Sequence, residues 1–251
     1  MKKVLAAALV AVSGVAVGSA AHAAPGAYTC SGGDIPSGSY TSITVTGPCT
    51  VAPNAVINVS GNINVAPGAL LDGQESPATI AVGHNITIGA GALVALGCQP
   101  ENAIGFAAGV PCPTDPTGHT TISVGKNVTA TSAAAVILRK LSIGGNVTAN
   151  GGGDGETPWA IKGNTIGGNV TVTNITPEFF LLGWSAIAGN VTLQSIHETD
   201  TDPDPFVGVV QNTIGRNLNC TDLLPRAGGG FVPGAVNHVG RKATGQCADL
   251  V

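Results

Sequence analysis

Apolar residues recur along the chain at fixed distances from an asparagine that itself repeats. Neighbouring copies of this asparagine lie 19 to 27 residues apart, except for one interval of 42 residues. The positions three before, one after and three after the asparagine are apolar in every copy, as Ile166, Val170 and Val172 are around Asn169. Such alternation, in short segments rich in β-branched residues, is typical of strands with one side against a core. The repeated asparagines are Asn62, Asn85, Asn127, Asn146, Asn169, Asn190 and Asn217.

A second apolar pattern precedes the asparagine and predicts a further strand in each repeat. Eight and ten residues before the asparagine stand Ile161 and Trp159 in one repeat, and Leu182 and Phe180 in the next. One repeat therefore holds three short strands and the turns between them, which is one coil of a parallel β-helix. The interval of 42 residues is about two periods, and it predicts one coil that has lost its asparagine.

The asparagine suits this architecture for a physical reason. A stacked amide can donate and accept hydrogen bonds along the axis and so pair backbone groups of the turns. It also tolerates the left-handed backbone of a tight corner. The repeat over residues 51–220 resembles the asparagine ladder of right-handed parallel β-helices of the pectate-lyase type. This resemblance implies an all-β fold, a single-stranded parallel β-helix or solenoid with an asparagine ladder.

The closing segment carries a second resemblance. The phrase from Asn237 to Arg241 echoes the phrase from Asn212 to Arg216, and the whole segment resembles the end of small exported actinobacterial proteins. The bactofilins also use Gly-Asn-Val phrases, but those polymers are cytosolic. Signs of export in this chain favour the exported actinobacterial proteins over the bactofilins.

Those signs lie at the ends of the chain and in its cysteines. A basic start, an apolar run and the small-residue site Ala21-His22-Ala23 are typical of a secretory signal peptide over residues 1–23. An even number of cysteines, six, predicts disulfides in an oxidising compartment. We expect disulfide-stapled caps over 24–50 and 222–251, on either side of coils over 51–221. The grouping of the cysteines along the chain favours the pairs Cys30–Cys49, Cys98–Cys112 and Cys220–Cys247.

The charge distribution narrows the classes of partner. Without the signal peptide the chain has eight Lys and Arg against 14 Asp and Glu, and no cation lies between Ala24 and Gly125. Nucleic acids and anionic membrane surfaces attract clusters of cations, so we expect neither as a partner. No later segment is long and apolar enough to span a bilayer. These features predict a secreted or cell-envelope protein whose mature chain has no membrane span.

Two groups of residues are candidates for binding. The variable loops that follow the repeated phrase leave each coil at the same point, and the longest carries alternating carboxylates that could bind calcium. Beside these loops, Arg139 and Lys162 point outward by strand parity, and Trp184 follows one coil later. Together the three could hold an acidic or neutral sugar chain. The alternative for each group is a solvated surface, with Trp184 covering a corner. The acidic residues are Glu198, Asp200, Asp202 and Asp204.

Catalytic patterns are weak in this sequence. No column of the repeat contains recurring Asp or Glu, which an acid–base pair on stacked coils would need. We therefore expect a non-enzymatic β-helix that acts as a structural or adhesion module in the envelope or outside the cell. Its expected partner is cell-wall or extracellular polysaccharide, and calcium is the one cofactor considered. The alternative is a polysaccharide-binding or polysaccharide-degrading lyase or hydrolase.

Overall fold

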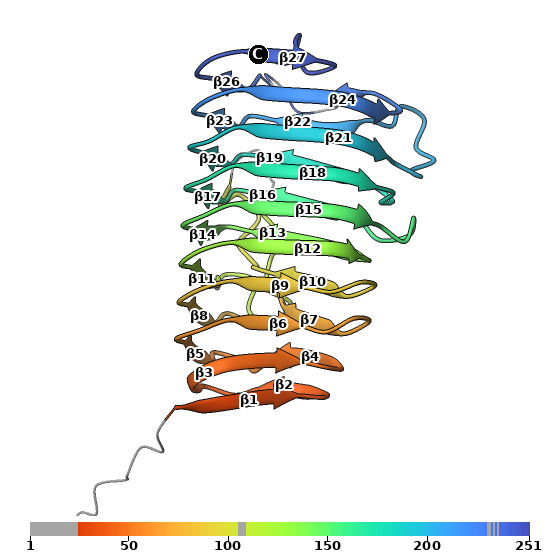
Figure 1. Ribbon diagram of the computed structural model, residues 1–251. Helices are drawn as coiled ribbons and strands as arrows, with labels where there is room; N and C mark the ends of the chain where they lie inside the picture. Colours follow the sequence, from red (N-terminus) through yellow and green to blue (C-terminus); the bar gives the residue numbers. More distant parts are fainter. Residues whose placement is uncertain (1–24, 105–108, 230–231, 233, 235) are drawn as a thin grey trace, which may run out of the picture.

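A computed structural model describes residues 25–104, 109–229, 232, 234 and 236–251 as a stack of parallel coils (Figure 1). Each full coil contributes one strand to each of three faces, as β16 (Trp159–Lys162), β17 (Thr165–Ile166) and β18 (Val170–Ile175) do. One face is a nine-stranded sheet, so the stack has about nine turns. The described residues contain strands and no helix. The predicted all-β solenoid with three strands per coil is confirmed.

The three faces follow one another in every coil. Face 1 precedes the repeated asparagine and contains β5 (Val56–Val59), β8 (Thr79–Val82), β11 (Thr121–Val124), β14 (Leu141–Ile143), β17, β20 (Ala186–Ile187), β23 (Thr213–Ile214) and β26 (His238–Val239). Face 2 follows the asparagine and contains β1 (Gly26–Cys30), β6 (Ile63–Val65), β9 (Ile86–Ile88), β12 (Val128–Ala133), β15 (Val147–Gly152), β18, β21 (Val191–His197), β24 (Leu218–Leu224) and β27 (Ala243–Gly245), while β3 (Gly38–Val45) runs through both faces. Face 3 is the nine-stranded sheet of β2 (Gly33–Ile35), β4 (Pro48–Val51), β7 (Leu70–Gly73), β10 (Leu93–Leu96), β13 (Ala135–Arg139), β16, β19 (Phe180–Gly183), β22 (Val207–Val210) and β25 (Ala227–Gly228).

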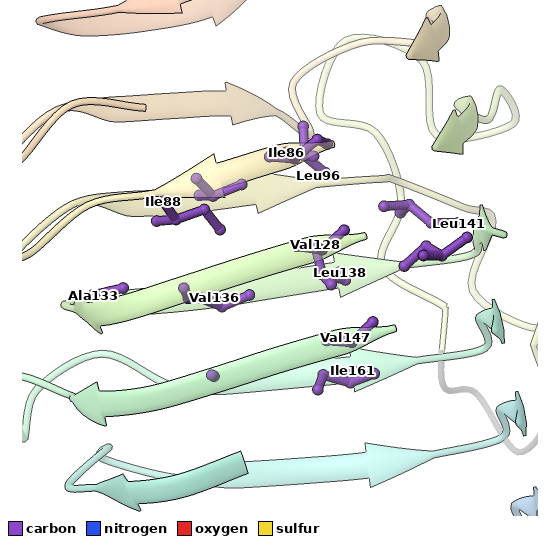
Figure 2. Close-up of a cluster of buried hydrophobic side chains, with 14 of the residues drawn as sticks. Ile86, Ile88, Leu96, Val128, Ala133, Val136, Leu138, Leu141, Val147 and Ile161 are labelled. Atoms are coloured by element: carbon purple, nitrogen blue, oxygen red, sulfur yellow. The ribbon is translucent and has the colours of Figure 1, made fainter. Parts of the chain in front are cut away.

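The core is a set of columns in which like residues lie above one another. Trp159 pairs with Phe180 in the register of face 3, and both side chains are fully buried. Leu138 pairs with Ile161 in the same way, and Figure 2 shows both pointing into the space between the faces. The inward columns predicted from the spacing are therefore confirmed, and each coil buries its apolar side against its neighbours.

The repeated asparagines form a continuous outer ladder. Asn169 Oδ1 accepts hydrogen bonds from the backbone N–H of Asn190 at 2.8 Å and from its Nδ2 at 3.1 Å. Asn169 in turn donates from both nitrogens to Asn146 Oδ1. The same contacts link Asn62 to Asn85 and Asn190 to Asn217. The ladder holds the corner between face 1 and face 2, where the amides are half-buried or exposed.

An inner ladder, which the sequence analysis missed, holds the corner between face 3 and face 1. Its members are Asn164, Ser185, Asn212 and Asn237, which are 0–2% exposed. Each accepts from or donates to the backbone of an adjacent coil; for example, Asn212 Oδ1 accepts from Ser185 N at 3.0 Å. The sequence did contain a signal of this ladder, because its members lie five residues before the outer-ladder position of their coils. Earlier coils carry apolar residues there, namely Ile57, Ile80, Ile122 and Leu141.

The interval of 42 residues contains no additional coil. The backbone N–H of Asn127 donates directly to Asn85 Oδ1 at 3.1 Å, and Val128 pairs with Ile86. The additional residues that the structure describes, 97–104 and 109–120, lie between β10 and β11, and we call them the 97–120 loop. The prediction of a coil without its asparagine was wrong, because an inserted loop of about one period gives the same spacing as a degenerate repeat.

Parallel pairing continues into both segments predicted as caps. β1 pairs with β3 and β2 with β4 at one end, and β26 and β27 pair with β23 and β24 at the other. At that second end Leu250 packs against the core, and its carbonyl accepts from Asn237 N at 2.8 Å. The signal peptide predicted over residues 1–23 lies outside the described residues.

All three predicted disulfides are present, namely Cys30–Cys49, Cys98–Cys112 and Cys220–Cys247. The first and third lie in the end coils, and the second closes part of the 97–120 loop. Three disulfides indicate an oxidising environment, such as the outside of a cell. Within the described part of the chain, no helix has the length and apolar character needed to cross a membrane.

Candidate functional site

Three loops lie side by side where the chain passes from face 2 to face 3. Backbone hydrogen bonds join them. Gly155 N donates to Thr176 O at 3.0 Å, and Asp200 N donates to Glu178 O at 2.9 Å. The common point of departure from the coil thus brings the variable loops together, as the sequence predicted. The loops cover residues 153–158, 176–179 and 198–206.

An open groove of about 740 Å³ lies on these loops, and we call it the loop groove. Phe179 and Phe206 form its apolar part, with ring centroids 6.2 Å apart in an edge-to-face arrangement. Arg226 Cζ lies 6.0 Å from the centroid of the Phe206 ring, and Arg226 Nη2 lies 2.6 Å from Asp204 Oδ1. The volume is within the usual range for small-molecule sites. Carboxylates and prolines complete the lining, namely Glu178, Asp200, Asp202, Asp204, Pro158, Pro203 and Pro205.

Three of the four carboxylates considered for calcium, those of Glu198, Asp200 and Asp204, have partners of their own. Glu198 Oε1 accepts from the backbone N–H of Phe180 at 2.7 Å, and Asp200 Oδ1 accepts from Asp202 N at 2.9 Å. Asp204 pairs with Arg226. Across the described residues, no three His, Cys, Asp or Glu side chains are arranged to hold a metal ion. The four acidic residues are therefore not gathered around one point, and a calcium titration tests whether the ion can gather them.

Glu198 is half-buried, and its acid–base properties are shifted. Burial raises the pKa of Glu198 to about 8, the hydrogen bond from Phe180 opposes this rise, and the charge of Asp200 adds to it. Its Oε2 is out of contact with solvent and has no hydrogen-bond partner. At neutral pH this carboxyl is therefore mostly protonated, close to acids that line the groove.

Arg139, Lys162 and Trp184 form a second group, which we call the cation cluster. β13 and β16 place Arg139 beside Lys162, because the two residues are register partners. Trp184 follows β19 in a left-handed conformation, with φ at 52°. Lys162 Nζ lies 5.6 Å from the centroid of the Trp184 ring. The structure thus brings the three predicted binding residues together, and Arg139 and Lys162 lie on the outward side of face 3, as parity predicted.

The cation cluster does not lie beside the loops, which corrects the expected position. The loops lead into the first residues of the face 3 strands, whereas Arg139 and Lys162 are the last residues of β13 and β16. Side-chain parity predicts on which side of the sheet a residue lies. The direction of the strand decides at which end of the strand the residue lies. The neighbour of the cluster is instead the 97–120 loop. A Cβ on Gly163 would come within 2.9 Å of Ile104 Cδ1, so this loop packs against the turn after Lys162.

Burial changes the acid–base properties of both cations. Burial and, to a smaller extent, the charge of Arg139 lower the pKa of Lys162 to about 8. Burial also lowers the pKa of Arg139, and the charge of Asp72 on β7 opposes this change. Arg139 Nε and Trp184 Nε1 are both out of contact with solvent and without a hydrogen-bond partner. The cluster is therefore a partly buried set of donors.

A third group, which the sequence analysis did not single out, lies at the corner between face 2 and the loops. His197 Nε2 lies 3.2 Å from Asp222 Oδ2. Hydrogen bonds from Ser195 and His197 lower the pKa of Asp222. Ser195 and Asp222 share one offset, five after the repeated asparagine, and both have positive φ. This group supports the corner.

Neither models of protein families nor characterised proteins nor solved structures give a match to this chain. Its function is therefore inferred from its own residues.

Proposed function

We propose that the protein is an exported, non-enzymatic β-helix that serves as an adhesion or structural module in the cell envelope or outside the cell, and that it binds polysaccharide in the loop groove. The proposal includes a right-handed helix of the pectate-lyase type and kinship with the small exported actinobacterial proteins that the closing segment resembles. The single observation that carries it is the combination of two aromatic rings and several carboxylates in one open groove.

The lining of the loop groove suits a sugar chain for two reasons. Sugar rings present C–H groups that pack on aromatic faces, which Phe179 and Phe206 supply. Sugar hydroxyls donate hydrogen bonds, and the carboxylates of Asp200 and Asp202 accept them. Four acidic residues line the groove, and Arg226 pairs with one of them, Asp204. The lining is therefore acidic overall, which favours neutral or basic sugars.

The scaffold also suits an adhesion module. The loops stand on strands whose inward side chains are fully buried, and the two ladders tie each coil to the next. Loops held by such a rigid frame lose little conformational freedom when a ligand binds. Disulfides in both end coils suit a protein that works where no reductant protects thiols.

The test is a glycan array with the full chain, followed by titration of the strongest ligand. Phe206→Ala removes one groove ring, and it should weaken binding by about 2 kcal/mol or more, roughly 30-fold. The matched control is Tyr28→Ala, which removes another half-buried aromatic ring at the distant end of the stack. Equal affinity of the Phe206 variant and the parent, or equal loss in both variants, would contradict binding in the loop groove.

A second candidate, a polysaccharide-degrading enzyme, is favoured by one observation. Glu198 has a raised pKa and lies near Asp200, and two carboxyl groups of which one acts as an acid are the pairing that glycoside hydrolysis needs. The assay is release of reducing ends or unsaturated products from the polysaccharides that the parent binds. Degradation by the parent that Glu198→Gln abolishes would establish the enzyme. Binding without products would leave the adhesion module.

A further inference from the structure

The cation cluster contains more hydrogen-bond donors than the protein satisfies. Arg139 and Lys162 are neighbours on adjacent strands, and Lys162 lies against the Trp184 ring. Among the described residues, the ion pairs are His197–Asp222 and Arg226–Asp204, so neither cation of the cluster has a carboxylate within 4.0 Å. Neither side chain makes a hydrogen bond with the described part of the protein. In addition, Arg139 Nε and Trp184 Nε1 are shielded from solvent.

This arrangement is unfavourable as it stands. A buried donor without an acceptor costs free energy, and a buried charge without a partner costs more. Two like charges on adjacent strands, about 5 Å apart along the stack, also repel each other. The nearest compensating charge is Asp72 on β7, which acts on Arg139 from two strands away across β10. A single anion between the cations would offset the repulsion and give the two charges a partner.

We propose that Arg139, Lys162 and Trp184 form a binding site for an oxyanion, that is, a sulfate, phosphate or carboxylate group. The planar guanidinium of Arg139 matches two oxygen atoms of such a group, and the Lys162 ammonium supplies a compact positive charge. The Trp184 ring lies against the Lys162 ammonium, so an anion bound at the cations changes the surroundings of its indole group. Both cations are half-buried and not enclosed, so an anion reaches them from solvent. The ligand is either a free inorganic anion or an acidic group on a polymer, such as a uronic acid.

The two tryptophans of the chain provide a direct readout. Trp184 belongs to the cluster, whereas Trp159 Nε1 already donates to Ala134 O at 2.9 Å in the interior. Titration of the full chain with sodium sulfate, and separately with sodium phosphate, should shift the indole N–H resonance of Trp184 in a nitrogen–proton correlation spectrum. The Trp159 resonance should stay in place. Sodium chloride at matched ionic strength controls for screening. No shift with sulfate or phosphate, or an equal shift with chloride, would overturn the site for inorganic anions.

Variants test which side chains hold the anion. Sulfate should raise the thermal midpoint of the parent, and Lys162→Met should abolish this rise. The matched control is Lys140→Met, because Lys140 follows Arg139 directly but is exposed. Loss of the sulfate effect in the Lys140 variant, or its retention in the Lys162 variant, would overturn the assignment. The parent supplies a test that needs no variant. The pKa of Lys162 is about 8, so Lys162 loses its positive charge as pH rises above 8. The sulfate affinity of the parent should therefore fall, and an unchanged affinity at pH 10 would count against Lys162.

The source of the anion is decided by a second titration, with oligogalacturonate and a neutral oligosaccharide of equal length. A Trp184 shift with oligogalacturonate and none with the neutral chain would assign the site to acidic polymers. A shift with sulfate or phosphate alone would assign it to free anions. If none of these probes shifts the Trp184 resonance, the proposal fails. That failure would not bear on polysaccharide binding in the loop groove, because the Phe206→Ala variant tests that binding separately.

Discussion

Replacing Asn212 by alanine should destabilise the solenoid more than any change in the outer ladder. Asn212 is fully buried. Its Oδ1 accepts from Ser185 N at 3.0 Å, and its Nδ2 donates to Leu182 O at 3.0 Å and to Asn237 Oδ1 at 2.9 Å. Alanine removes all three bonds. Asn237 Oδ1 still accepts from the backbone N–H of residue 212, but Ser185 N–H is left in an apolar interior without an acceptor. A buried group without its partner costs about 1–3 kcal/mol, so we expect a loss of about 2–4 kcal/mol in the free energy of unfolding.

The control is Asn169→Ala in the outer ladder. Asn169 accepts the equivalent bonds from Asn190, but it is exposed, so water can replace the lost amide and the cost should be about 1 kcal/mol. For a chain of this length each kcal/mol shifts the thermal midpoint by about 2–4 °C. The assay is thermal unfolding followed by circular dichroism. The Asn212 variant should melt roughly 10 °C below the parent, and the Asn169 variant a few degrees below. Equal shifts in the thermal midpoint would show that burial does not decide how much a ladder amide contributes to stability.

Three further predictions concern the core, the acidic loop and calcium. Phe180→Ala removes a fully buried ring that lies over Trp159 and should cost about 3–5 kcal/mol in urea unfolding; a cost below 1 kcal/mol would mean that the column is not tightly packed. The pKa of Glu198 is raised from 4.5 to about 8 in the folded chain, so between these values the native state binds more protons than the unfolded state, and stability should fall as pH rises from 4.5 to 8. Thermal midpoints across this range should show that slope for the parent and a weaker one for Glu198→Gln, and a parent whose stability rises would contradict the buried carboxyl. Calcium chloride should leave the thermal midpoint unchanged relative to a chelator, because no three carboxylates of the described residues are arranged to hold a metal ion; a clear rise would show that the ion gathers them.

The coil could be predicted because its cause is local and repeated. A residue such as Ile166 must lie above its counterpart in the next coil, so the same side-chain type recurs at the same offset. Strand parity then fixed which residues point inward, and it placed Trp159 in the core and Arg139 on the surface. The disulfides could be predicted for a related reason. Adjacent coils bring residues about one period apart into contact, and Cys30 and Cys49 are 19 residues apart.

The errors have a different origin. The 97–120 loop has no repeat of its own, so counting residues could not separate it from a coil. The inner ladder begins only at Asn164, after four coils with apolar residues at that position, and its second member is Ser185. A search for one recurring residue type therefore passes over it. The position of the cation cluster depended on which end of a strand the loops enter, and the packing of Gly163, next to Lys162, depended on Ile104 in a loop from another coil. Neither follows from a periodic pattern.

The coil also separates the two candidate sites by charge. Every strand of face 3 runs in the same direction, so the loops that precede the strands gather at one edge, and the last residues of the strands gather at the other. The acids of the longest loop therefore collect in the loop groove, while Arg139 and Lys162 collect about 10 Å away, the length of a four-residue strand. An anionic chain suits the cation cluster and is repelled by the groove, and a basic chain shows the reverse preference. A single polymer that fills both sites must therefore alternate acidic with neutral or basic sugars, and a polymer with one kind of charge should occupy only one edge of the face.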